Sequence, residues 1–188
     1  MQKQVKIEII RSNRKTIAIE IKSDATVLVR APFFMRDAEI QKFVKEKERW
    51  ITEHLQKAAE RQQKTEHVQK LTMEEVNQLA DLALDVIPKK VRYYADRMKV
   101  SYGRITIRNQ KTRWGSCSGK GNLNFNCLLM LAPDEVIDYV VVHELCHLIE
   151  MNHSKAFWQQ VESVMPDYKT YRQWLKEHGN EIMSRMLY

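Results

Sequence analysis

The chain has no long apolar run and little cysteine. No stretch approaches the roughly 18 consecutive apolar residues of a membrane span. The opening residues, MQKQVKIEII, lack the apolar segment and small-residue cleavage site of a signal peptide. Three cysteines, at positions 117, 127 and 146, are an odd number and do not suggest a disulfide framework. These absences argue against a membrane protein and a disulfide scaffold, and they predict a reduced, cytoplasmic protein.

Acidic residues are nearly absent from one segment. Residues 89–120 hold ten basic residues and one acidic residue, a net charge of +9, whereas the whole chain has a net charge of +7. Residues 71–88 and 121–188 each have a net charge of −4. The basic segment is a candidate contact for nucleic acid or another polyanion, although composition alone favours a solvated surface without a partner.

The first 31 residues have the pattern of β-strands. Residues 5–10, 16–22 and 25–31 are rich in β-branched side chains and partly alternate between apolar and polar. Turn-like residues separate the three runs, and Pro32 follows the last one. The simplest prediction is an antiparallel meander of three strands.

Helical spacing of apolar residues follows. It covers residues 36–63, and the polar stretch 56–70 is either a solvated helix end or a linker. Thr72 and Glu75 match a capping box at the start of the next helix. Pro88 predicts that this helix is kinked or divided, because proline lacks a backbone N–H.

The second half of the chain mixes strands and helices. Residues 104–109 and 123–131 have the composition of strands. Pro133 suits the first turn of a helix that opens with Asp134 and is apolar on more than one side, so we expect it to be buried. Further helices are predicted over residues 154–165 and 167–179.

These elements predict an α+β fold. We expect a single domain spanning residues 1–188, with an N-terminal subregion of strands and helix at residues 1–70. The candidate functional residues all lie in the rest of the chain, residues 71–188, which we expect to be the core.

A His-Glu-x-x-His pattern lies in the buried helix. His143 and His147 are four residues apart, so in a helix they lie on the same face and can bind one metal ion. Glu144 is about 100° further round the helix, from where its carboxylate can reach a water on the metal without being a ligand. Burying these three polar side chains without a metal would be costly. The pattern therefore predicts a catalytic metal site.

A third ligand is expected at His153. In an unbroken helix it would lie about 15 Å along the axis from His143, too far to share one ion. The helix must therefore end before His153, near Met151 and Asn152, where Asn152 tolerates the left-handed conformation. Ser154 can then cap the next helix.

Two other residues are alternative ligands. Glu162 could supply a carboxylate from the following helix, but His153 is preferred because it is near and follows turn-forming residues. Cys146 lies between the two histidines but is turned away from them, so we interpret it as a small buried side chain.

The stretch RWGSC precedes the second strand. Arg113 is a candidate substrate contact, since a guanidinium can bind an anion or a substrate carbonyl. Gly115 suits a tight backbone turn. Trp114 and Cys117 are interpreted as packing residues.

The segments RNQKTRWGSCS and HELCHLIEMNHSKAFW together resemble the YgjP-like metallopeptidase family, which is related to the SprT-like and WLM zinc metallopeptidases. The opening RSNRKTIAIEIK and the segment LAPDEVIDYVVVHELCH also match, so the resemblance covers nearly the whole chain. It implies a minimal zincin core at residues 71–188 and one Zn²⁺ per chain held by His143, His147 and His153. It further implies that Glu144 is the general base, acting on a zinc-bound water, and that the substrate is a peptide or protein. An extended peptide is expected to pair with an edge of the strand at residues 123–131.

Two other functions stay open. A metal-dependent hydrolase of nucleotides or other phosphate anhydrides could use the basic segment, but the chain lacks a glycine-rich phosphate loop and a carboxylate cluster for magnesium. A nucleic-acid-associated zinc protein with a structural metal is the other alternative, although structural zinc sites usually have four protein ligands.

Overall fold

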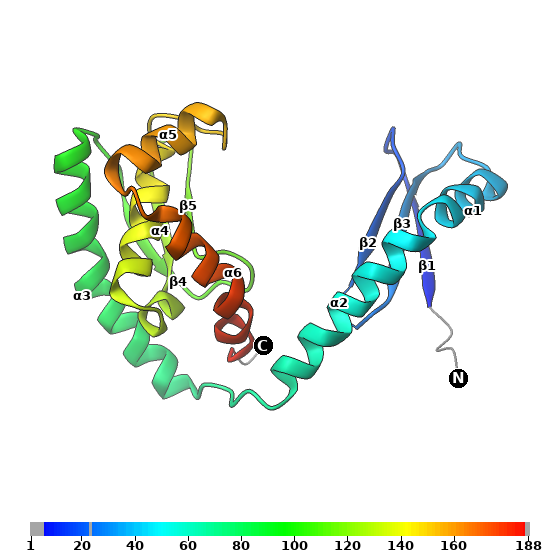
Figure 1. The fold of residues 1–188 in the computed structure, drawn as a ribbon, viewed down its shortest axis with the longest axis horizontal. Helices are drawn as coiled ribbons and strands as arrows, with labels where there is room; N and C mark the ends of the chain where they lie inside the picture. Colours follow the sequence, from blue (N-terminus) through cyan, green and yellow to red (C-terminus); the bar gives the residue numbers. More distant parts are fainter. Residues whose placement is uncertain (1–5, 23, 187–188) are drawn as a thin grey trace. The chain divides into compact units, whose positions relative to one another are not determined.

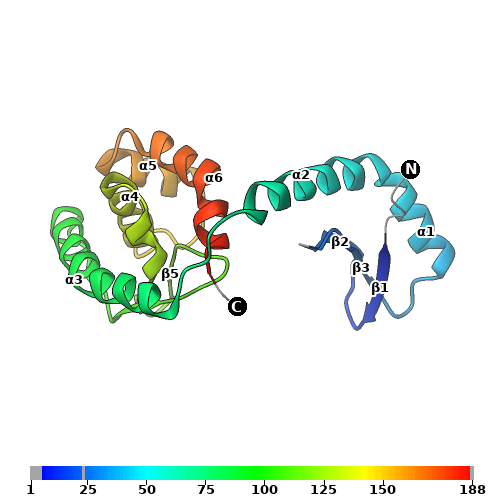
Figure 2. The same ribbon diagram turned by 90° about the horizontal axis from the view of Figure 1, so that it is seen from below.

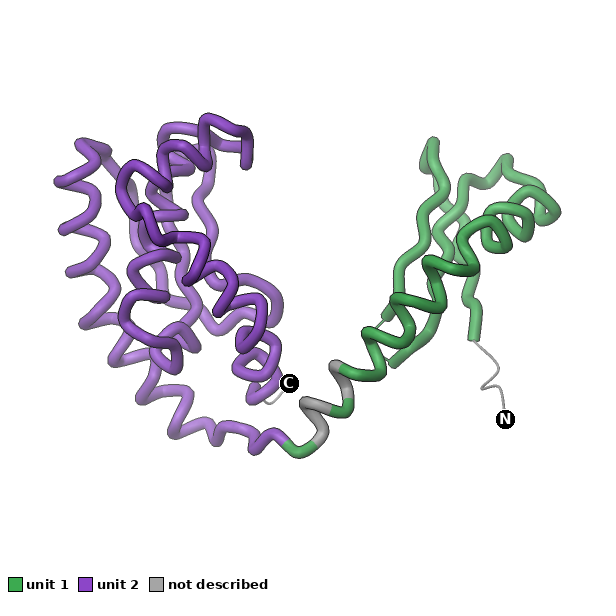
Figure 3. The backbone as a smooth tube through the Cα atoms, viewed as in Figure 1, with its two compact units in different colours: residues 1–67 green, residues 68–188 purple. Residues whose placement is uncertain are grey.

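The chain forms two compact units, residues 1–67 and 68–188, which are coloured separately in Figure 3. The structure is a computed structural model that describes residues 6–22 and 24–186, with residues 61, 62 and 64–66 described by their backbone alone. The boundary at residue 67 lies close to the subregion boundary expected at residue 70. Folding of the whole chain as one domain stays a prediction.

In the first unit, two helices cover one side of a three-stranded sheet (Figures 1 and 2). Its elements are β1 (Ile7–Ser12), β2 (Ala18–Ile21), β3 (Val27–Pro32), α1 (Asp37–Glu46) and α2 (Glu48–Glu66). Val27, Val29 and Ala31 alternate along β3, so they share one face, and all three are fully buried. They pack against Ile40 of α1 and Ile51 of α2, and this cluster is the core of the unit.

The predicted antiparallel meander is wrong. The strand order is β1-β3-β2, with β1 parallel to β3 and β2 antiparallel to it. Because β3 is the most deeply buried strand of the three, pairing on both its edges protects the backbone of the most apolar segment. The alternation in the sequence indicated which side chains share a face, but it did not indicate the partner of each strand. Val5, at the start of the first predicted strand, and Ser23, in the turn predicted before the third, lie outside the described residues.

The second unit begins with the long helix α3 (Met73–Met98). The predicted capping box is confirmed: the Thr72 hydroxyl accepts a hydrogen bond from the Glu75 N–H at 3.2 Å, and the Glu75 carboxylate accepts one from the Thr72 N–H at 2.7 Å. Pro88 lies inside this one helix, so the helix is not divided. Proline removes one backbone hydrogen bond, and burial of the apolar face of α3 in the core of the unit offsets that loss.

A second three-stranded sheet lies beside α3. It consists of β4 (Ile105–Arg108), β5 (Gly115–Cys117) and β6 (Leu123–Asn126), in the order β4-β6-β5. β4 is parallel to β6, and β5 is antiparallel to it. Since β6 is the central strand, the expectation that it offers a free edge to a peptide is wrong.

The strand predicted over residues 123–131 is only half correct. It ends at Asn126, and the 3₁₀-helix η1 (Cys127–Leu131) follows. The Asn126 side chain causes the change, because its carbonyl accepts a hydrogen bond from the Leu128 N–H at 3.1 Å. Its amide group donates to the carbonyls of Gln110 and Arg113, at 2.7 and 3.0 Å, and so ties this turn to the loop before β5.

The remaining helices are α4 (Asp134–Cys146), α5 (Lys155–Val164) and α6 (Tyr168–Ser184). Helix α4 contacts α3, α5, α6 and β5, and Figure 2 shows it inside this group. Beyond the exposed Asp134 and Glu135 of its first turn, most of its residues are buried, which agrees with a sequence that is apolar on more than one side. The predicted α+β class is confirmed, with the His-Glu-x-x-His pattern at the end of the buried helix. Within residues 6–22 and 24–186, no helix is long and apolar enough to cross a membrane.

Candidate metal centre

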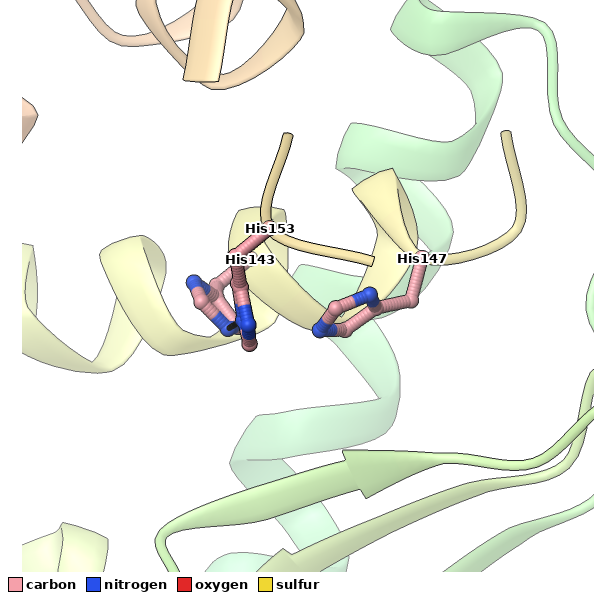
Figure 4. A group of neighbouring side chains, drawn as sticks. All are labelled: His143, His147 and His153. Carbon is pink, nitrogen blue, oxygen red and sulfur yellow. Dashed lines mark hydrogen bonds between the residues drawn. The ribbon is translucent and has the colours of Figure 1, made fainter. Parts of the chain in front are cut away.

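Three histidine side chains meet at the end of α4. His143 lies in the last turn of the helix, His147 is its C-terminal cap, and His153 lies in the following loop. Figure 4 shows the three rings directed toward one another. One nitrogen of each ring lies within 4.8 Å of the other two, and the Nε2 atoms of His143 and His153 are 3.0 Å apart. The structure thus brings together the three residues that the sequence selected.

The chain reverses direction between His147 and His153, as the sequence required. Helix α4 ends at Cys146, earlier than expected, and the N–H groups of Ile149 and Glu150 both bond to the Cys146 carbonyl. This tight turn makes a left-handed residue unnecessary. Asn152, which tolerates the left-handed conformation, does not adopt it, because among the described non-glycine residues only Ala25 and Lys99 have positive φ.

The start of α5 fixes the position of His153. The Ser154 hydroxyl accepts a hydrogen bond from the Phe157 N–H at 3.3 Å, so the predicted cap is confirmed. The same turn brings the fully buried Phe157 ring against all three histidines, with ring centroids 4.6 to 4.9 Å away. The histidines are therefore packed on one rigid aromatic surface.

The histidine nitrogens suit a metal ion. Nδ1 of His147 is 3.1 Å from the Glu150 carbonyl; a proton on this nitrogen would be donated there, which leaves Nε2 free as a ligand. The Nε2 atoms of His143 and His153 face each other, and a cation between them could bind both when neither carries a proton. Tetrahedral coordination with Zn–N bonds near 2.0 Å places ligand nitrogens about 3.3 Å apart. The 3.0 Å between these two atoms is close to this value, while the three ligand nitrogens together lie within 4.8 Å of one another.

Burial keeps two of the rings in the neutral form that binds metals. It lowers the pKa of His143 to about 3, and the charges of His147, His153 and Arg172 act in the same direction. Burial also lowers the pKa of His147. These rings are therefore unprotonated at neutral pH.

Glu144 lies beside the cluster without joining it. Its side chain is 5% exposed, and burial raises its pKa to about 8, while the positive charge of Arg113 opposes the rise. Its Oε2 atom has no hydrogen-bond partner among the described residues. The backbone of Gly115 lies so close that a Cβ atom there would be 2.6 Å from Oε1 of Glu144. The carboxyl group is held between α4 and β5.

A hollow of about 280 Å³ opens onto these groups. The three histidines, Glu144 and Met151 line one side of it, and Arg113 and residues 115–117 of the β5 segment line the other. A larger hollow of about 620 Å³ in the first unit is lined mainly by aliphatic side chains of β1, α1 and α2. We place the chemistry in the smaller hollow because it contains the histidines and the buried carboxyl group.

The other residues selected from the sequence lie as follows. Arg113 is exposed and lines the hollow. Trp114 packs against α6, where a Cβ at Gly179 would be 3.2 Å from its ring. Cys117 lines the hollow although the sequence suggested a packing role.

Neither alternative ligand joins the histidines. Cys146 is fully buried, and burial raises its pKa to about 12, so its thiol stays protonated. Glu162 is exposed and forms an ion pair with Lys169 at 3.3 Å.

Three groups around the histidine cluster were not predicted from the sequence: the Phe157 ring, the Glu150 carbonyl and Arg172. Phe157 follows the cap residue Ser154 by three positions, so its place on the inner face of α5 could have been inferred. The Glu150 contact comes from the backbone and has no sequence signal. Arg172 lies over the Trp158 ring, 4.4 Å from its centroid, and Trp158 stacks on His153.

Comparisons with known proteins give one family match in sequence and matches among solved structures. The sequence model of the family described as YgjP-like, metallopeptidase domain, matches residues 15–78 and 77–178. Among solved structures, the metallopeptidase zymogen abylysin of Pyrococcus abyssi is 23% identical over 49% of this chain and 94% of its own, with a TM-score of 0.45. The zymogen jannalysin of Methanocaldococcus jannaschii is 18% identical over 48% of this chain and 94% of its own, with a TM-score of 0.44. A search of curated proteins gives no match.

Proposed function

The chain belongs to the YgjP-like metallopeptidase domain family, and on this premise we propose that it is a zinc-dependent peptidase. In this proposal His143, His147 and His153 hold one zinc ion, and Glu144 is the general base. The observation that carries the proposal is the convergence of three histidine nitrogens within 4.8 Å beside one buried carboxyl group. Three ligands leave a fourth position open, as catalytic rather than structural zinc sites do.

Glu144 is suited to moving a proton. Zinc in such a site lowers the pKa of a coordinated water toward neutrality and polarises a carbonyl group. Glu144 accepts a proton from the attacking water as the new O–C bond forms, and it passes a proton to the leaving nitrogen as the C–N bond breaks. Its pKa of about 8 lies near neutral pH, which favours both transfers. Positive charge in the histidine cluster would favour the carboxylate form that accepts the first proton.

The edge strand β5 offers a place for an extended substrate. Among the described strands it pairs only with β6, so its other edge is free. Gly115, Ser116 and Cys117 also line the hollow of the histidine cluster. A peptide that pairs with this edge through its backbone would bring a carbonyl group next to the histidines.

Replacing Glu144 with glutamine tests the proposal. The Glu144→Gln variant should bind as much zinc as the wild type, while cleavage of casein or peptides falls by about 10²–10⁴-fold, the range for general acid–base groups. Glu162→Gln is the matched control, because Glu162 is an exposed acid paired with Lys169 and should leave both properties unchanged. Zinc would be measured by elemental analysis of the purified protein. Full activity in Glu144→Gln would rule out its role as base.

A phosphate-anhydride hydrolase is the second candidate. The exposed Arg113 beside the histidines favours it, since a guanidinium binds phosphate well. Against it, the only metal-binding cluster found among the described residues is composed of histidines rather than carboxylates. Part of the basic segment is also engaged, because Lys90 bonds to Asp134 and Asp138 at 2.7 Å. Phosphate or pyrophosphate release from nucleoside triphosphates, measured beside peptide cleavage, decides between the two.

Salt-dependent binding of DNA would test the nucleic-acid alternative.

A further inference from the structure

A second hollow, of about 260 Å³, adjoins the metal centre. It shares Arg113, Gly115, His143 and Glu144 with the first hollow but is not lined by His147 or His153. A group bound there lies on the side of Glu144 that faces away from two of the three histidines. Because Glu144 gives its proton to the leaving nitrogen, this is where we expect the residue that carries that nitrogen.

Several side chains that line the second hollow can donate hydrogen bonds. The side chains of Thr112, Arg113 and Tyr139 line it, and none of the three donates a hydrogen bond to a residue within the described ranges. The only carboxylate in the lining is Glu144, on which the positive charge of Arg113 acts. Within the described residues no hydrogen bond joins the two side chains, so the donors of Thr112, Arg113 and Tyr139 are available to a ligand.

The remaining walls are apolar, and Trp114, Val140 and Leu175 complete the lining. The apolar walls would strengthen an ion pair formed inside the hollow by excluding water.

We propose that the second hollow binds a carboxylate of the substrate residue that follows the scissile bond, with Arg113 as its ion-pair partner. Arg113 is then a specificity-determining residue, and Tyr139 and Thr112 supply further hydrogen bonds. The proposal rests on the peptidase function proposed above. The carboxylate comes either from the free C-terminus of the peptide or from an acidic side chain, and both have the same planar shape that pairs with a guanidinium.

Four acetylated alanine tripeptides separate these two sources. They differ only in the last residue, which is alanine with a free carboxylate, alanine amide, glutamate amide or glutamine amide. In one of the two pairs, the wild type should cleave the member that carries the carboxylate with kcat/KM at least about tenfold higher, the effect of one charge-assisted hydrogen bond. A preference within the alanine pair identifies a C-terminal carboxylate, and one within the glutamate and glutamine pair identifies a side chain. Preference in neither pair overturns the proposal.

Arg113→Ala should bring the kcat/KM values of the two peptides in the preferred pair close together, so that their ratio is near one. Arg113→Lys should restore part of it, because the charge returns without the planar fork. Arg92→Ala is the matched control: it removes the same charge from an exposed position on α3 that lines neither hollow, and it should leave the ratio unchanged. A ratio that persists in Arg113→Ala would overturn the assignment of Arg113.

Binding distinguishes this proposal from the peptidase proposal. Zinc-loaded Glu144→Gln protein would be titrated with the same four peptides by calorimetry. The carboxylate member of one pair should bind about tenfold more tightly, and this difference should vanish when Arg113→Ala is added. If the wild type cleaves none of the peptides, the peptidase proposal fails for them, and the titration alone decides the role of the hollow. Equal affinities for all four peptides would overturn the carboxylate subsite.

Discussion

The backbone of Gly115 lies directly against the carboxyl group of Glu144, and a Cβ atom at position 115 would be 2.6 Å from Oε1 and 2.7 Å from Cγ. Glycine is the only residue that leaves the proposed base in its present position. This contact connects β5 to α4, so the RWGSC stretch and the His-Glu-x-x-His pattern form one site.

Gly115→Ala should therefore displace Glu144 and disable the enzyme. We expect peptide cleavage to fall by about a hundredfold, the loss that a misplacement near 1 Å can cause. The three atoms nearest to the new methyl group all belong to Glu144, so zinc content should stay at the wild-type value. Gly119→Ala is the control, because a Cβ there meets nothing within 4 Å. Zinc loss in Gly115→Ala would contradict this separation of roles.

His153→Ala should weaken zinc binding more strongly than any change around the ligands. Loss of an outer partner of a ligand costs about 10- to 100-fold in metal affinity, and loss of a ligand should cost more than about a hundredfold. Competition with a chelating dye measures the affinity. Glu162→Ala should have the affinity of the wild type. The reverse result, with Glu162 essential and His153 dispensable, would assign the third ligand to α5.

Phe157→Leu should loosen the metal site while leaving its ligands in place. The ring contacts all three histidines, so a smaller side chain frees them, and we expect zinc affinity to fall about tenfold. Phe125→Leu is a matched control, because Phe125 is equally buried in β6 and is not in ring contact with the histidines. Both variants should lose about 1–3 kcal/mol of stability. Only Phe157→Leu should change the affinity.

The stability of the metal-free protein should depend on Glu144 between about pH 4.5 and pH 8. Burial raises the pKa of this group from 4.5 to about 8 in the folded protein. A raised pKa stabilises the folded state fully below the unfolded value, and the contribution is lost as pH rises through the folded value. The contribution of Glu144 should therefore lower the melting temperature of chelator-treated protein across this interval, by on the order of 5 °C. The lowered pKa values of His143 and His147 act in the opposite direction below about pH 6.5, so the comparison with a Glu144 variant isolates this contribution. Glu144→Gln should show a flatter profile. If the melting temperature of that variant depends on pH as steeply as in the wild type, other groups cause the dependence.

The sequence predicted the convergence of the three histidines because all its rules there were local. Helical spacing placed His143 and His147 on one face, and the distance to His153 required a break in the helix. Capping at Thr72 and Ser154 was equally local, and both caps are present. The helix ended earlier than expected, because a turn of backbone hydrogen bonds at Cys146 replaced the left-handed residue.

The failures concern contacts between distant segments. The partners of β1 and β6 are set by which strand is most buried, and alternation within a strand does not encode this. Gly115 was interpreted as a turn residue, whereas its role depends on Glu144, which is far from it in sequence. The second hollow combines residues from the β5 segment, α4 and α6, so no single motif could indicate it.

All three histidines lie within residues 143–153, so bringing them together closes only a very short loop of chain. The entropy cost of such a loop is small, and a newly made or partly unfolded chain could capture zinc as soon as α4 and the start of α5 form. The contact between Gly115 and Glu144 needs the sheet and the helix together. The histidine cluster therefore depends on local contacts, whereas the position of Glu144 depends on contacts between distant segments, so the two can form at different stages of folding.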